Sequence, residues 1–159
     1  MNYTLTDSQA QFREKIREFV NEWVIPTAHS RDKEDVYPLE IIKKMSSRGY
    51  PALTVPGEYG GLDGTKLDAC ILLEEVAYGC AATAVSLVTI FQAETMLLLF
   101  GNENLKSKFL PMFRTGLIAS YALTELKRGS DIRQLETKAV RKGSKWVLNG
   151  RKTFITSAS

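Results

Sequence analysis

At 159 residues, 44% hydrophobic and 25% charged, the chain can form one well-buried core, which excludes disordered and collagen-like classes. Its net charge of +3 is uneven, because residues 127–159 hold nine basic and two acidic side chains. That segment fits either a polyanion such as a dinucleotide or the solvated face of a hairpin, and its strand-like alternation argues against nucleic acid.

The cysteines and the single histidine offer little chemistry. Cys70 and Cys80 lie on apolar segments with no CxxC spacing, so we interpret both as buried thiols and predict neither a disulfide nor a metal site. His29 sits in a polar stretch and is expected at the surface. Because Met1 is followed by a helix-start pattern without a basic region and apolar run, we predict a cytoplasmic location.

Five helices are predicted in the first part of the chain. Thr6 and Gln9 form a capping box, and the apolar residues that follow recur at spacings of three and four until Pro26, which bends or ends the helix. Pro38 opens the second helix and Gly49 stops it. The remaining three helices are expected at residues 65–78, 81–100 and 103–113.

Two of these stretches have special features. Residues 55–64 contain four glycines and a proline, which predicts an irregular loop that either wraps a ligand or tightly connects two helices. The stretch 81–100 has about the length of a membrane span, but Gln92 and Glu94 interrupt it. We therefore expect a core helix and no membrane insertion.

Near Leu117 the period of the pattern changes from that of a helix to that of a strand. Strands are predicted at 117–123, 136–140, 145–148 and 154–156, with hairpin connections at residues 142–144 and at Asn149-Gly150. The order indicates an α+β protein, with residues 1–116 as a helical domain and residues 117–159 as the first strands of an incomplete antiparallel β-domain. Partner strands are expected from another chain or from residues that have been cut away.

Few residues suggest chemistry by themselves. The adjacent acids Glu74 and Glu75 are interpreted as exposed charge. The segment 121–131 leaves a strand and enters a glycine-containing turn, which can present amides and hydroxyls to a ligand. Phe154 and Thr156 are two residues apart, so both would face one side of a strand, where they could either hold a flavin ring or simply pack.

Four segments together resemble the acyl-CoA dehydrogenase family. They are the VPGEYGG loop at 55–61, LEEVA at 73–77, YALTELKRGSD at 121–131 and NGRKTFIT at 149–156. Their joint order covers the whole chain and implies the family's helical domain followed by the start of its middle β-domain. The expected activity is α,β-dehydrogenation of an acyl-CoA or acyl-carrier-protein thioester, with hydride transfer to FAD.

The resemblance also implies roles for individual residues. Main chain from Tyr121 to Ser130 and the hydroxyl of Thr124 would contact FAD, Ser130 would lie at both flavin and substrate, Phe154 would cover the flavin, and Thr156 would bond near its N5 atom. The full set of implied cofactor-binding residues is Tyr121, Leu123, Thr124, Gly129, Ser130, Phe154, Ile155 and Thr156. The family's catalytic glutamate corresponds to no residue here, and Glu125 is not assigned that role.

Two departures from the family pattern lead to alternatives. Leu126 and Arg128 stand where the family signature has proline and alanine, which makes the turn less rigid and more positive. The chain is also less than half the family's usual length. We therefore expect a fragment or split subunit that works in fatty acid metabolism with a complementary or identical chain and passes electrons to an electron-transfer flavoprotein. The alternative is a non-catalytic, FAD-free interaction module or a shortened remnant.

Overall fold

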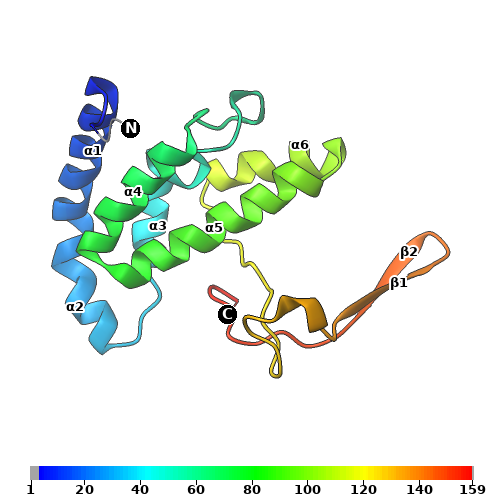
Figure 1. Cartoon of the computed structure of the whole chain (residues 1–159). Helices are drawn as coiled ribbons and strands as arrows, with labels where there is room; N and C mark the ends of the chain where they lie inside the picture. The colour runs from blue at the N-terminus through cyan, green and yellow to red at the C-terminus, as the bar shows by residue number, and fades with distance from the viewer. Residues whose placement is uncertain (1–3, 159) are drawn as a thin grey trace.

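The computed structural model describes residues 4–158 as a helical body followed by one β-hairpin (Figure 1). The helices and strands are α1 (Asp7–Phe19), α2 (Ile25–Lys33), α3 (Leu39–Ser47), α4 (Lys66–Gly79), α5 (Ala81–Phe100), α6 (Glu103–Arg114), β1 (Lys138–Lys142) and β2 (Lys145–Asn149). This mostly helical chain with a small antiparallel sheet confirms the predicted α+β class.

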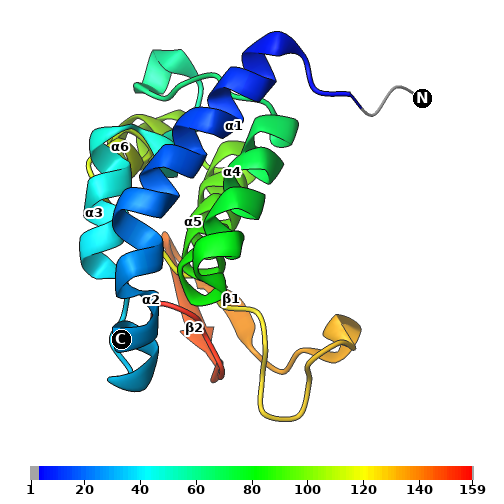
Figure 2. The same ribbon diagram turned by 90° about the vertical axis from the view of Figure 1, so that its left-hand side faces the viewer.

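The first predicted helix is in fact two helices joined by a π-helical turn. The capping box is confirmed: the Thr6 hydroxyl accepts from the Gln9 amide, and the Gln9 side chain accepts from the Thr6 amide. The π-helical turn Val20–Val24 then leads directly into α2 (Figure 2). Pro26 lies in the first turn of α2, where an amide hydrogen has no helical partner to lose, so it bends the path without ending it.

The core lies where α4 packs between α1 and α5, with α3 and α6 completing the helical body (Figures 1 and 2). Fully buried side chains such as Phe19, Leu72 and Leu87 come from all three central helices. Among the described residues, α5 is the one helix long and apolar enough to cross a membrane. Its packing against α4 and α6 and its buried face confirm the predicted core helix.

The glycine-rich loop folds back on the segment that precedes it. The amides of Leu62 and Gly64 donate to the carbonyl groups of Ala52 and Leu53, at 3.2 and 2.7 Å. At Gly61 an added Cβ would lie 1.9 Å from the carbonyl oxygen of Val55, so no side chain fits there. The loop is therefore a tight connector between α3 and α4, which is one of the two predicted alternatives.

Two interpretations of single residues are wrong, and a third is only partly right. Glu75 is only 6% exposed, because it faces α1 and binds the Arg17 guanidinium through two hydrogen bonds of 2.7 and 3.1 Å. Cys70 is exposed on the outer side of α4, and Cys80, at the start of α5, is half-buried. The apolar neighbours of these cysteines in sequence belong to other faces of the helices.

The β-domain contains less regular structure than the sequence predicts. The register of the hairpin pairs Val140 with Val147, which confirms the second and third predicted strands. Residues 117–123 and 154–156 are not strands, and Gly150 does not form a hairpin turn. Instead, an added Cβ at Gly150 would lie 2.1 Å from the Thr137 hydroxyl, so this glycine permits a close approach of two segments. An extended segment becomes a strand only beside a partner, and the two segments find none within residues 4–158.

Candidate functional site

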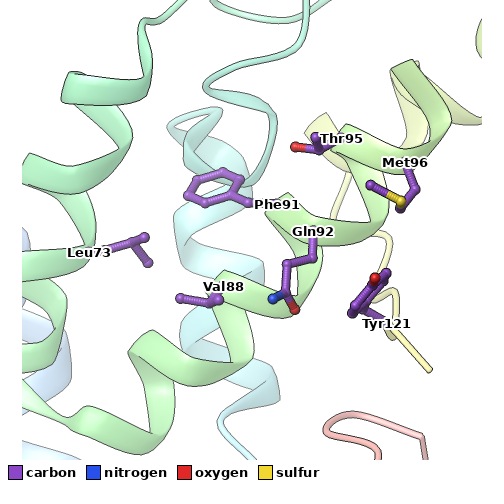
Figure 3. A pocket seen from close by; sticks show the side chains of 7 residues that line it. All are labelled: Leu73, Val88, Phe91, Gln92, Thr95, Met96 and Tyr121. Atoms are coloured by element: carbon purple, nitrogen blue, oxygen red, sulfur yellow. The ribbon is translucent and has the colours of Figure 1, made fainter. Parts of the chain in front are cut away.

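A cavity of about 350 Å³ lies along α5 on the side that faces α4 and the start of the β-domain (Figure 3). The seven lining residues are Leu73 from α4, Val88, Phe91, Gln92, Thr95 and Met96 from α5, and Tyr121. The α5 residues recur at spacings of three and four, so they form one continuous face of the helix.

This cavity has an apolar lining with a few neutral polar groups. Leu73, Val88, Phe91 and Met96 provide hydrocarbon, sulfur and aromatic surface, whereas Gln92 provides an amide group (Figure 3). No charged side chain lines it within the described residues. An apolar cleft with a small number of polar groups is the usual form of a site for a small organic ligand.

Tyr121 links the cavity to the segment that carries most of the predicted site residues. Figure 3 shows its ring beside Gln92 and Met96 of α5. Leu123 and Thr124 follow two and three residues later in the chain and are half-buried. The Thr124 carbonyl oxygen accepts a 2.9 Å hydrogen bond from the amide of Thr153, so the segment that contains Phe154 lies directly beside it.

The residues brought together here present groups that fit a flavin. The Phe154 ring is 89% exposed, and the hydroxyl groups of Thr124 and Thr156 form no hydrogen bond to any residue within 4–158. An open aromatic face with free hydroxyl groups nearby suits a planar ring with nitrogen and carbonyl acceptors. Phe154 has a φ of +55°, however, so it does not share a strand face with Thr156, and Ile155 between them is half-buried.

Gly129 and Ser130 are placed differently. A tight turn precedes them, in which the amide and carbonyl groups of Glu125 and Arg128 bond each other at 2.9 and 3.0 Å. The turn closes without the proline that the family signature has at Leu126. Gly129 and Ser130 are exposed beyond it and do not line the cavity. Hydrogen bonds therefore join Leu123 and Thr124 to the residues just before Phe154. Within the described residues, Tyr121 is the one predicted cofactor-binding residue that lines the cavity, and Gly129 and Ser130 lie apart from both.

Glu94, which interrupts the apolar stretch 81–100, is an ionisable group near the cavity to which the sequence alone assigns no chemistry. It lies on the inner side of α5, is fully buried, and accepts a hydrogen bond from the Thr54 hydroxyl. Burial raises the pKa of Glu94 to about 7, although the Thr54 hydroxyl and the Lys66 ammonium act in the opposite direction. The feature of the sequence that points to Glu94 is the presence of a charged residue in the most apolar stretch of the chain. Glu94 does not line the cavity.

Comparison with known proteins covers the chain from residue 6 to its end. Residues 6–116 match the family model described as acyl-CoA dehydrogenase, N-terminal domain, and residues 120–159 match acyl-CoA dehydrogenase, middle domain. An acyl-CoA dehydrogenase of Bacillus subtilis (strain 168) is 35% identical over 155 residues, which are 96% of this chain and 41% of that protein. The chain thus spans about two-fifths of the length of the curated relatives it matches.

Solved structures give the same result. A glutaryl-coenzyme A dehydrogenase in complex with glutaryl-CoA superimposes with a TM-score of 0.90 at 32% identity, covering 98% of this chain and 40% of that one. The FAD complex of PigA superimposes with a TM-score of 0.89 at 30% identity, covering 98% of this chain and 42% of that one. Both likenesses include the helical body and the β-hairpin segment, since nearly the whole chain is aligned.

Proposed function

The chain belongs to the acyl-CoA dehydrogenase family, and from this premise we propose that it forms one wall of an acyl-thioester pocket and part of an FAD site. One observation carries the proposal: Tyr121, the first residue of the signature segment, lines the same cavity as α4 and α5. A ligand in that cavity would therefore lie next to the residues that would hold a flavin.

The residues proposed to hold FAD are those implied by the family signature. Phe154 would cover the ring, the hydroxyl groups of Thr124 and Thr156 would donate to its heteroatoms, and main chain from Tyr121 to Ser130 would complete the contact. Bound FAD supplies a hydride acceptor, which this chain's own side chains do not. The role of the chain is to orient that group against the acyl thioester and to keep water from the apolar cavity.

The rest of the proposed enzyme, including its catalytic base, lies outside these 159 residues, either in further sequence of the same protein or in a complementary polypeptide. This chain spans only about two-fifths of its relatives, and we assign the catalytic base to no residue in it. Residues 117–159 are proposed as the first strands of the middle domain, which strands outside these residues would complete. An electron-transfer flavoprotein is the proposed electron acceptor, and CoA and carrier protein both remain candidate acyl carriers.

The lining of the cavity also favours an uncharged acyl group. A carboxylate at the far end of the acyl chain would meet no lysine or arginine among the described lining residues. Burying an unpaired carboxylate costs several kcal/mol. We therefore expect pentanoyl-CoA to bind at least about tenfold more tightly than glutaryl-CoA, which has the same chain length but ends in a carboxylate.

Methyl NMR of the full chain can test this preference with an internal control. Titration with pentanoyl-CoA is expected to shift the methyl signal of Met96, which lines the cavity, and to leave that of the core residue Met45 unchanged. Substituting Val88→Phe fills the cavity and should weaken binding about tenfold. Val85→Phe is the matched control, because Val85 lies on the same helix, is 50% exposed and does not line the cavity.

The outcomes of that titration separate two parts of the proposal. If neither thioester shifts Met96, the acyl pocket is contradicted. If both bind equally, the pocket stands and the preference for an uncharged acyl group is wrong.

A second candidate function is a non-catalytic interaction module that binds a partner through its sheet edge. The β1–β2 hairpin favours it, since the outer edges of both strands are unpaired within residues 4–158 and Trp146 and Leu148 are largely exposed. A protein of this kind would bind its partner without FAD and would not bind acyl thioesters.

A further inference from the structure

A single buried carboxylate connects three separate segments of the β-domain. Glu125 is only 6% exposed and accepts from the amides of Glu136 and Thr137, at 2.6 and 2.9 Å. It also accepts from the Lys152 ammonium at 2.9 Å. Both oxygens of the carboxylate are therefore occupied, and each of its donors comes from a residue at least eleven positions away in the chain.

Lys152 extends this connection to the segment beside the cavity. Its ammonium group donates a second hydrogen bond, of 2.8 Å, to the carbonyl oxygen of Leu123. The next residue, Thr153, donates its amide to the carbonyl oxygen of Thr124 at 2.9 Å. The residues just before the Glu125 turn and the residues just before Phe154 are thus bonded to each other at two adjacent positions.

We infer that the Glu125–Lys152 pair is a positioning device, which holds the Leu123-Thr124 segment against the Phe154–Thr156 segment in the geometry that a flavin needs. The inference rests on the proposed function, because it concerns the same flavin-contacting residues. The side chains of Glu125 and Lys152 do not themselves contact the flavin. They act through the backbone groups that they hold in place.

The physical reason is that no regular element within residues 4–158 joins the two segments to each other, although the hydroxyl groups of Ser157 and Tyr37 share a 2.8 Å hydrogen bond that ties the second segment to the helical body. Neither segment is a strand, so a regular ladder of hydrogen bonds does not fix their separation. Hydrogen bonds to a charged group are stronger than those between neutral groups and lose much of their strength when one charge is removed. Hydrogen bonding from Thr137, the Glu136 amide and Lys152 lowers the pKa of Glu125 to about 2, so the carboxylate stays charged throughout the neutral pH range.

Substitutions at the two positions test the inference by FAD titration of the full chain, followed by flavin fluorescence. We expect Glu125→Gln and Lys152→Met each to weaken FAD binding at least about tenfold. Lys152→Arg keeps the charge and the donors and should restore most of the affinity lost in Lys152→Met. The matched control is Lys145→Met, which removes an exposed lysine of β2 outside this cluster and should bind FAD like the wild type.

Two further readouts separate positioning from folding and from the proposed function. Circular dichroism should show the same helical content and melting temperature in every variant, since the cluster lies outside the helical core. Amide hydrogen exchange, measured without FAD, should be faster in Glu125→Gln at Thr153, Glu136 and Thr137.

Equal FAD affinity in all variants would overturn the inference. If the wild type itself binds no FAD, the proposed flavin site fails, and unchanged amide exchange in Glu125→Gln would then overturn the positioning role as well.

Discussion

Substituting Glu94→Gln is expected to remove a loss of stability of about 3 kcal/mol that the wild type undergoes between about pH 4 and about pH 8. The pKa of Glu94 rises from its ordinary value of 4.5 to about 7 on folding. Between these two values the folded state binds more protons than the unfolded state, so the wild type loses stability as the pH rises. The glutamine variant does not titrate in this range, so its free energy of unfolding relative to the wild type should increase with pH.

Urea denaturation followed by circular dichroism at several pH values measures this difference directly. The difference in free energy of unfolding between the variant and the wild type should be nearly constant below about pH 4 and again above about pH 8. At those limits Glu94 has the same charge in the folded and the unfolded state. Glu18→Gln is the matched control, since Glu18 is an exposed acid on α1. A difference between Glu94→Gln and wild type that does not change with pH would show that Glu94 is not a buried, titrating carboxyl.

Substituting Gly61→Ala is expected to destabilise the fold by about 3 kcal/mol, the upper end of the usual cost of overpacking. The added methyl group would lie 1.9 Å from the carbonyl oxygen of Val55. That oxygen cannot easily move, because Val55 is fully buried and its carbonyl accepts the amide of Asp63 at 3.2 Å. The loop would have to open, which would disturb the start of α4.

Gly129→Ala provides the comparison for Gly61→Ala. Nothing lies within 4 Å of a Cβ added at Gly129, and its φ is not in the left-handed region, so stability should change by less than about 0.5 kcal/mol. Denaturant unfolding of both variants, followed by Trp fluorescence and circular dichroism, measures the two changes. Equal stability of Gly61→Ala and wild type would mean that the loop does not pack as tightly as described.

The helical part of the fold could be predicted from sequence because its signals are local. The Thr6 capping box, the stop at Gly49 and the apolar period of 81–100 each depend on residues within a few positions of one another. The strands at 117–123 and 154–156 could not be decided in this way. An alternating pattern shows which residues can form a strand, whereas pairing requires a neighbour supplied by tertiary structure.

The same distinction applies to the candidate site. Motif order alone identifies the signature residues between Tyr121 and Thr156, whereas the structure places Tyr121 at a cavity that no motif describes. The sequence does not reveal Glu75 and Glu125 as buried acids, since their partners Arg17 and Lys152 lie 58 and 27 positions away. Long-range ion pairs leave no periodic trace in a single sequence, and the burial of a carboxylate depends on such partners.

The most direct test of the central claim is the visible absorption spectrum of the purified chain together with any polypeptide that co-purifies with it, identified by mass. The spectrum is recorded with added FAD, before and after the addition of a CoA thioester whose acyl group is uncharged, in the absence of oxygen. The proposed function predicts a bound-flavin spectrum that bleaches when the acyl-CoA is added. A folded chain that leaves the FAD spectrum unchanged, with and without cell extract as a source of partners, would contradict it.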